Sequence, residues 1–260
     1  MDAHRRYRTL LVEASGPVLT IVLNRPERRN PIGVEMVNEL VWALDDAKDD
    51  PDVRVVVLTG AGQVFSAGGD LKQMSIDDEG LPVRGDFVDL LLRFTTLGKP
   101  TIAKVRGPAM GGALGLVASC DFAVASTGST FGTPEISRGL FPFMIMAVLR
   151  RVVSRRRLLD MMLLGESLDA ATAASIELVT KVVGEAELDA EVESLAAKLA
   201  SRSPTALRMG LQAFHAHADH DLATALPALR DQLGAILGTE DGREGLMAFL
   251  EKRAPRWTGR

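Results

Sequence analysis

The sequence predicts an α/β fold in which short strands are joined by helices. Its 260 residues are 47% hydrophobic and 25% charged, the balance of a folded globular chain, and this length can bury a core without disulfides. In the first two-thirds of the chain, short β-branched runs alternate with helical patterns, which is typical of strands with crossover helices. The last third is almost wholly helical in pattern. The single cysteine, Cys120, cannot form an intramolecular disulfide.

The N-terminal elements follow from hydrophobic spacing. Residues 7–14 and 17–23 predict a hairpin around Gly16-Pro17. Residues 33–48 predict an amphipathic helix, because apolar residues recur there at helical intervals. Residues 53–59, VRVVVLT, are nearly all apolar and β-branched, as expected for a strand that is covered on both faces. The same pattern in shorter form predicts strands at 101–105 and 121–125.

The rest of the chain divides into a polar loop and a helical region. Segment 70–85 is polar, contains glycine and proline, and carries acids at 77–79, which predicts a mobile surface loop that can act as a lid. We expect residues 1–198 to form the core and residues 199–260 a helical region that packs on the core and on neighbouring subunits. After Pro142 the patterns predict a strand at 178–183 and helices at 186–201, 204–218, 221–237 and 240–250.

Composition excludes several functional classes. Thirty basic against 34 acidic residues give a net charge of −4, which disfavours a nucleic-acid binder that must neutralise many phosphates. The N-terminus has no apolar run of the signal-peptide type. The longest apolar stretch, 140–149, is interrupted by Pro142 and has half of the roughly 20 residues that a membrane span needs. We expect a cytoplasmic protein without a membrane span.

Several motifs that would indicate nucleotide binding, a serine nucleophile, a phosphate site or a metal site are incomplete or unspecific. Gly60-Ala-Gly62 follows a strand, but Phe65 takes the third glycine position of a dinucleotide fingerprint, and no P-loop occurs. Ser66 stands in half of a nucleophile elbow, with Val64 where glycine is required. The arginine-rich run 150–157 is typical of a solvated face or a subunit contact, with a phosphate site as the alternative. Three histidines, at 215, 217 and 220, lack the spacing of a metal site.

Two glycine-rich segments carry the strongest functional signal. Residues 66–70 follow the strand at 53–59, and residues 107–112 follow the strand at 101–105. Glycines let the backbone approach a ligand, and the run after Gly111 predicts a helix whose first N–H groups are unpaired. This is how an oxyanion hole is built. The alternative for either segment alone is a tight turn in which glycine serves only the geometry.

The whole chain resembles the crotonase superfamily, the enoyl-CoA hydratase/isomerase family. The resemblance rests on five motifs in the family's order: LNRPERRNPIG (23–33), VLTGAGQVFSAGGDLKQM (57–74), VRGPAMGGALGLVASCDFAVAS (105–126), FGTPEISRGLFP (131–142) and GTEDGREGLMAFLEKRAP (238–255). It implies a spiral of ββα units with a helical C-terminal trimerisation region. It also implies a trimer or a dimer of trimers that acts on an acyl-CoA thioester as its substrate, with no metal and no further cofactor.

The resemblance implies roles for individual residues. The backbone N–H groups of Ala67 and Gly112 are expected to hold the thioester oxygen, and Glu135 is expected to transfer protons. Apolar neighbours of Glu135 are expected to raise its pKa; the alternative is an acid at a helix start after Pro134. The substrate contacts that the resemblance implies are Arg25, Ser66, Ala67, Gly68, Gly69, Asp70, Leu71, Gly111, Gly112, Pro134, Leu140, Phe141, Phe249 and Lys252.

Two departures from the family bear on the reaction. Hydratases of the family carry a second glutamate three residues after the oxyanion-hole glycine, where this chain has Gly115. One glutamate suffices for a β,γ to α,β double-bond shift, whereas hydration uses two, so isomerisation is favoured and hydration stays open. Bulky residues at 142–146 predict a pocket for an irregular or branched apolar acyl group. The competing interpretations are a non-catalytic acyl-CoA binding protein and a serine hydrolase that uses Ser66.

Overall fold

The centre of the molecule is a six-stranded sheet with the order β1-β2-β3-β4-β6-β9. The computed structural model describes residues 7–70, 72–73 and 80–260. Strands β1 and β2 form the expected antiparallel hairpin, and each later strand runs parallel to its neighbour. The strands of this sheet are β1 (Leu10–Ser15), β2 (Val18–Leu23), β3 (Val55–Gly60), β4 (Thr101–Val105), β6 (Phe122–Ser126) and β9 (Lys181–Val183).

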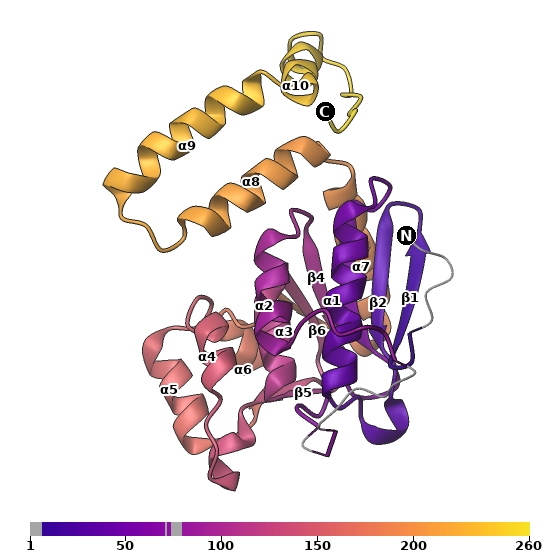
Figure 1. Ribbon diagram of the computed structural model, residues 1–260, viewed down its shortest axis with the longest axis vertical. Coiled ribbons are helices and arrows are strands. Elements are labelled where there is room, and N and C mark those ends of the chain that lie inside the picture. The colour runs from indigo at the N-terminus through magenta and orange to yellow at the C-terminus, as the bar shows by residue number, and fades with distance from the viewer. Residues whose placement is uncertain (1–6, 71, 74–79) are drawn as a thin grey trace.

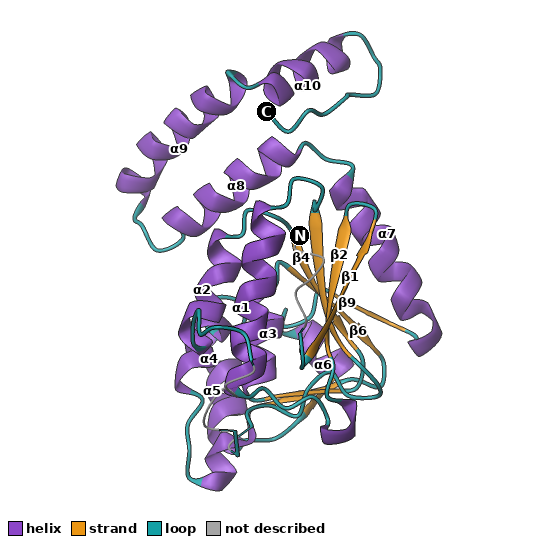
Figure 2. Cartoon of the chain, turned by 45° about the vertical axis from the view of Figure 1, so that its right-hand side comes forward, coloured by secondary structure: helices purple, strands orange, loops and turns teal. Residues whose placement is uncertain are grey.

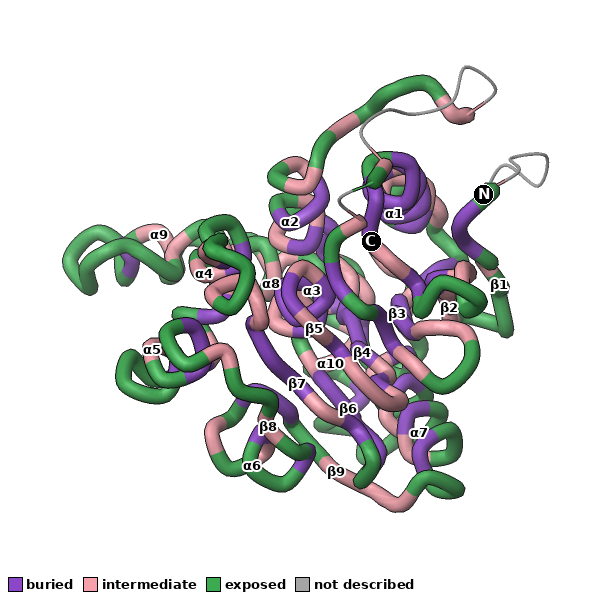
Figure 3. Tube along the Cα trace, turned by 90° about the horizontal axis from the view of Figure 1, so that it is seen from below, coloured by how far each residue is buried: buried purple, intermediate pink, exposed green. Residues whose placement is uncertain are grey.

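Helices cover both faces of this sheet, as the continuous apolar pattern of β3 predicts (Figure 2). Successive residues of a strand point to opposite faces. Val56 and Leu58 belong to the larger core, on the side of helices α1 (Val34–Asp49), α2 (Phe87–Thr96) and α3 (Gly112–Ser119). Val55 and Val57 pack instead with residues of α7 (Leu188–Ala200), which follows a short 3₁₀ turn (Glu185–Glu187). Seen from below, the buried segments gather around β3, β4, β6 and α3 (Figure 3).

A second, three-stranded sheet was not expected from the sequence. It has the order β5-β7-β8, with β5 (Pro108–Met110), β7 (Thr130–Gly132) and β8 (Leu168–Asp169). Strands of two or three residues show no hydrophobic alternation, so no sequence pattern announces them. Because β5 begins three residues after β4 ends, this sheet lies beyond the carboxyl ends of the first (Figure 2). Beside it lie the helices α4 (Phe143–Leu149), α5 (Arg155–Leu164) and α6 (Ala170–Ser175).

The C-terminal helices form an arm at one end of the molecule (Figure 1). Helices α8 (Pro204–His217), α9 (Leu222–Leu237) and α10 (Glu240–Leu250) match the expected ranges to within one residue at each end. Helix α8 lies next to α9 and against α2. In the described part of the chain no helix is long and apolar enough to cross a membrane. The arm leaves large apolar side chains exposed, among them Phe214, Leu222, Leu226, Leu233, Leu246, Phe249 and Leu250.

Candidate functional site

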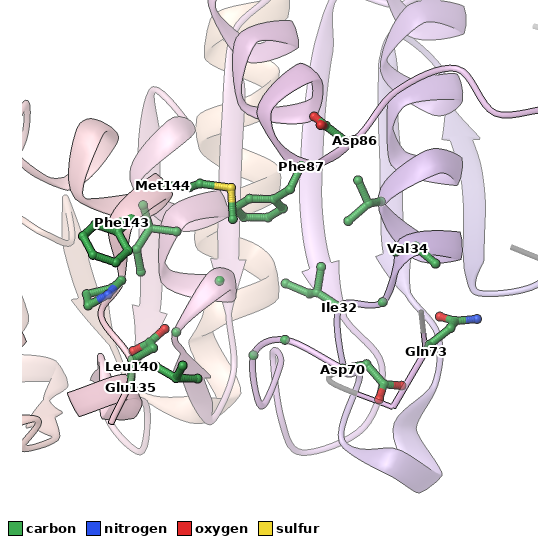
Figure 4. A pocket seen from close by; sticks show the side chains of 18 of the residues that line it. Ile32, Val34, Asp70, Gln73, Asp86, Phe87, Glu135, Leu140, Phe143 and Met144 are labelled. Carbon is green, nitrogen blue, oxygen red and sulfur yellow. The ribbon is translucent and has the colours of Figure 1, made fainter. Parts of the chain in front are cut away.

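A cavity of about 710 Å³ opens beside the N-terminus of α3, beyond the carboxyl ends of the parallel strands (Figure 4). Nine of the residues expected to contact substrate line it, together with the expected proton-transfer residue Glu135: Ala67, Gly68, Gly69, Asp70, Gly111, Gly112, Pro134, Leu140 and Phe141. Four others do not line it: Arg25, Ser66, Phe249 and Lys252. Leu71 and residues 74–79 of the expected lid, among them the acids at 77–79, lie outside the described residues.

The two glycine-rich segments are joined to one another by backbone hydrogen bonds. Ser66 N donates to Pro108 O at 3.1 Å, and Met110 N donates to Ser66 O at 3.1 Å. Gly68 has a φ of 96°, and a Cβ atom there would come within 2.7 Å of Met110 O. Only glycine accepts both that conformation and that approach. The prediction that these two segments form one site is consistent with these bonds, since each segment follows a parallel strand of one sheet.

In the first segment, the hydrogen bonds leave one N–H group free. Ala67 N donates to Arg29 O at 2.9 Å, Gly68 N to Ser66 Oγ at 3.1 Å, and Asp70 N to Ile32 O at 2.9 Å. Gly69 N alone has no acceptor in this run among the described residues. The prediction that the Ala67 N–H faces a ligand is therefore wrong, because the Arg29 carbonyl already holds it. The free donor that lines the cavity is Gly69.

The second segment contributes one free N–H group in the same way. Gly111 N donates to Gly132 O at 2.9 Å. Gly112 is the first residue of α3, and its N–H has no acceptor among the residues that the structure describes. The partial positive charge of the helix N-terminus lies at this group. One free donor from each segment thus lines one cavity, which suits a single oxygen that gains negative charge.

Glu135 is held beside these donors by a 3₁₀ helix, Pro134–Arg138. A Cβ atom on Gly111, whose φ is 53°, would come within 2.7 Å of Glu135 Oε1, so the carboxyl group lies against the glycine backbone. Its Oε2 atom is buried and has no hydrogen-bond partner among the described residues. Burial raises the pKa of Glu135, outweighing the backbone hydrogen bond and the Arg138 charge that lower it. The expected direction of this pKa shift is confirmed.

The other carboxyl groups that line the cavity already have partners. Asp70 Oδ2 pairs with Arg28 at 3.0 Å. Asp86 caps α2, where its Oδ1 accepts hydrogen bonds from the N–H groups of Val88 and Asp89. One oxygen of Asp70 is thus held by an ion pair, and one oxygen of Asp86 by the helix cap. Among the described residues, Glu135 is the cavity carboxylate with a buried oxygen that has no hydrogen-bond partner.

The wall of the cavity at Gly115 is apolar. A Cβ atom on Gly115 would overlap Ile145 Cγ2 and come within 3.0 Å of Ile145 Cβ. Ile145 is 3% exposed and lines the cavity, so it fills the space that a side chain at 115 would take. The ring of Phe87 lies 3.7 Å from the position of a Cβ on Gly112. Phe143 and Met144 line the outer part of the cavity, where the bulky segment 142–146 was expected (Figure 4).

Gly115→Ala should lower stability because its new methyl group competes with Ile145 for space. Overpacking of this kind costs about 1–3 kcal/mol, and each kcal/mol lowers the melting temperature of a chain this size by roughly 2–4 °C. Ile145→Ala alone should cost about 2–5 kcal/mol through the void that it leaves. The double variant should lose less than the sum of the two costs, as measured by thermal unfolding. Simple additivity would show that the two side chains do not share this space.

The structure also bears on the competing motifs. Ser66 is fully buried and its hydroxyl accepts the Gly68 N–H, so it is not presented as a nucleophile. The arginines of 150–157 are exposed, as a solvated face requires. No group of three or more potential metal ligands gathers within the described ranges. Sequence reasoning missed Phe87 and α2, although Asp86 and Asp89 before an apolar helical pattern are a capping signal.

Comparisons with known proteins agree with this geometry. A family model described as enoyl-CoA hydratase/isomerase matches residues 13–260. A protein of Mycobacterium tuberculosis, named a probable enoyl-CoA hydratase, is 34% identical over 255 residues, which cover 98% of this chain and 99% of that protein. The human mitochondrial enoyl-CoA hydratase domain-containing protein 3 is 35% identical over 245 residues, which cover 93% of this chain and 80% of the human protein.

Solved structures share the whole fold. The crystal structure of an enoyl-CoA hydratase from Mycobacterium smegmatis superposes with a TM-score of 0.89 at 33% identity and covers 96% of this chain and 98% of that one. The crystal structure of the human domain-containing protein 3 gives a TM-score of 0.86 at 33% identity, covering 96% of this chain and all of that one, 100%. The expected fold, α/β with a helical C-terminal region, is confirmed.

Proposed function

Because the chain belongs to the enoyl-CoA hydratase/isomerase family, we propose that it shifts the double bond of an enoyl-CoA thioester from the β,γ to the α,β position. The observation that carries this proposal is Glu135, whose buried Oε2 has no hydrogen-bond partner, beside two N–H groups that have no acceptor, all among the described residues. The CoA thioester is the substrate, and the proposed chemistry uses no metal and no further cofactor. A cytoplasmic location is part of the same proposal.

The two N–H groups are proposed to stabilise the enolate. When a proton leaves the α-carbon of a thioester, its electrons move onto the thioester oxygen as an enolate. In the proposed complex that oxygen lies between Gly69 N–H and Gly112 N–H, which both line the cavity. Fixed donors in a site shielded from water need no reorganisation when the charge forms. The N-terminus of α3 adds its partial positive charge at Gly112.

Glu135 is proposed to carry the proton in both directions. Its carboxylate takes the α-proton, and the enolate forms with the β,γ double bond conjugated to it. The protonated Glu135 then gives the proton to the γ-carbon, the double bond settles between the α- and β-carbons, and the carboxylate is regenerated. One group suffices, because it can reach both the α- and the γ-carbon from the same face of the bound acyl chain. The raised pKa suits a group that must gain and lose a proton near neutral pH.

Hydration is less well supported by the same cavity. Adding water across the double bond uses one group that activates the water and a second that protonates the α-carbon. The position of the family's second glutamate is Gly115, and Ile145 fills the adjoining space. The remaining cavity carboxylates, Asp70 and Asp86, are engaged with Arg28 and with α2. Isomerisation therefore needs only groups that the cavity holds.

The ultraviolet absorbance of the conjugated 2-enoyl thioester provides a direct test. With 3-hexenoyl-CoA the absorbance should rise as the conjugated product forms, and with 2-hexenoyl-CoA it should persist. Loss of absorbance from 2-hexenoyl-CoA would identify a hydratase. Tight binding of either thioester without any absorbance change would identify a non-catalytic binding protein, and a stable acyl group on Ser66 would identify a hydrolase.

The rate should depend on pH through Glu135. The carboxylate is the active form, so kcat/KM should fall as the pH drops through the pKa of Glu135. Because burial raises that pKa, the fall should be centred above 4.5, the ordinary value for glutamate. A pH series of initial rates with 3-hexenoyl-CoA measures this limb. A limb at or below the ordinary glutamate value would contradict the assignment.

We also propose that the chain assembles as a trimer or a dimer of trimers. The arm formed by α8, α9 and α10 exposes a series of apolar side chains that a second copy can cover. Phe249 is 81% exposed, and neither it nor Lys252 lines the cavity of its own chain. In the assembly these two residues are proposed to reach the CoA bound by a neighbour. Light scattering should give three or six times the chain mass, and a monomer would contradict the proposal.

A further inference from the structure

Asn30 is a fully buried asparagine that touches no part of the cavity. It lies two residues after the 3₁₀ helix Pro26–Arg28 and has a φ of 52°. Asparagine is one of the few residues other than glycine that adopt this left-handed conformation readily. Its backbone N–H donates to Arg25 O at 2.9 Å, which closes the turn.

The side-chain amide of Asn30 joins two loops. Its Oδ1 atom accepts a hydrogen bond from Arg25 N at 2.9 Å. Its Nδ2 atom donates to three carbonyl oxygens of the loop after β3, those of Ala61 at 2.9 Å, Val64 at 2.8 Å and Phe65 at 3.2 Å. A buried amide with every polar atom satisfied holds its partners in one arrangement. The turn after β2 is thereby fixed to the loop that leads into residues 66–70.

The same turn holds the first glycine-rich segment by its backbone. Arg29, the residue before Asn30, accepts a hydrogen bond on its carbonyl oxygen from Ala67 N at 2.9 Å. Ile32 N donates to Gly68 O at 2.8 Å, and Ile32 O accepts from Asp70 N at 2.9 Å. These bonds lie on both sides of Gly69 in a parallel bridge with Ile32 and do not use the Gly69 N–H, which has no acceptor among the described residues. The orientation of that N–H therefore depends on where residues 29–32 are held.

We propose that Asn30 is a positioning residue for the Gly69 N–H group, acting through the turn 29–32 and the loop 61–65. The inference rests on the proposed function, since it assumes that Gly69 and Gly112 hold the thioester oxygen. Loss of the Asn30 amide would let the turn and the loop shift relative to each other. The Gly69 donor would then be misaligned with the thioester oxygen, while the cavity that binds the acyl group stays in place.

Two variants test the Asn30 amide, and a third serves as the control. Asn30→Gly keeps the left-handed backbone and removes the side chain. Asn30→Asp keeps the size but turns an acceptor toward the three carbonyl oxygens. The control is Asn38→Asp: Asn38 is also buried, at 1% exposure, and donates to loop carbonyls, those of Leu81 and Pro82 at 3.1 Å. Its side-chain hydrogen bonds among the described residues go to residues 81–84 and not to the glycine-rich segments.

The experiment is infrared spectroscopy of bound hexanoyl-CoA, which cannot isomerise, with ¹³C in the thioester carbonyl. In the wild type the carbonyl stretch should move to lower frequency on binding, because two donors polarise the bond. In Asn30→Gly and Asn30→Asp the shift should be clearly smaller and kcat for 3-hexenoyl-CoA lower by about tenfold or more, with little change in the Kd of hexanoyl-CoA. Asn38→Asp should keep the full shift.

The outcomes separate the two proposals. A wild-type protein that binds hexanoyl-CoA without a carbonyl shift would overturn both the donor assignment and the role of Asn30. A full shift in the wild type and in folded Asn30→Gly would overturn the role of Asn30 alone. If Asn30→Gly and Asn30→Asp do not fold, Asn30→Ser, whose side chain is shorter and cannot bridge the turn and the loop as the amide does, gives the same test, and an undiminished shift there again overturns the role.

Discussion

Replacing Glu135 with glutamine is expected to lower kcat for 3-hexenoyl-CoA by about 10²–10⁴-fold, because the positioned base is lost while the shape of the side chain is kept. The KM should change little, since the cavity and both N–H donors remain. Glutamine is neutral and cannot accept a proton at neutral pH. Initial rates of formation of the conjugated thioester measure the loss.

The matched control is Glu193→Gln on the exposed face of α7, which makes the same chemical change away from the cavity. It should leave kcat unchanged. A Glu135→Gln variant that keeps wild-type turnover while remaining folded would show that Glu135 is no proton carrier. The interpretation as a non-catalytic acyl-CoA binding protein would then be favoured, provided that the variant and the wild type bind CoA thioesters equally well.

Replacing Gly112 with proline is expected to lower kcat by about 10²–10³-fold, the cost of one lost oxyanion donor. Proline lacks the N–H group but is tolerated in the first turn of a helix, and Gly112 is the first residue of α3. The matched control is Gly112→Ala, which keeps the N–H and adds a methyl group at ordinary contact distance, 3.7 Å from the Phe87 ring.

The pair separates the N–H from the side chain. Gly112→Ala should keep kcat within a few-fold of wild type, whereas Gly112→Pro should lose it with its fold intact by circular dichroism. Equal losses in the two variants would mean that the space around Gly112, and not its N–H group, is what the reaction requires.

The sequence predicted the main sheet because its strands carry their own signal. A strand covered on both faces, such as β3, has a continuous apolar sequence. The helices between such strands are recognised by apolar residues at helical intervals. The second sheet escaped because its strands have only two or three residues. Helix α2 escaped although its cap, Asp86, is visible in the sequence.

The site was predicted to the level of segments but not of single atoms. The resemblance brought Glu135 and both glycine-rich segments to one place, where the cavity lies. It chose Ala67 over Gly69 as the donor, because the sequence does not show which N–H groups the turn 29–32 engages. The departure at Gly115 was visible in the sequence. That Ile145 fills its space was not, since this contact joins two helices.

Proton NMR of the purified protein with crotonyl-CoA and, separately, with 3-hexenoyl-CoA in D₂O tests the central claim most directly. If Glu135 works without a second carboxylate, 3-hexenoyl-CoA becomes 2-hexenoyl-CoA and crotonyl-CoA stays unhydrated over the same time. Formation of 3-hydroxybutyryl-CoA at a rate that matches or exceeds isomerisation would contradict it, because a second proton-transfer group would then have to act in the cavity.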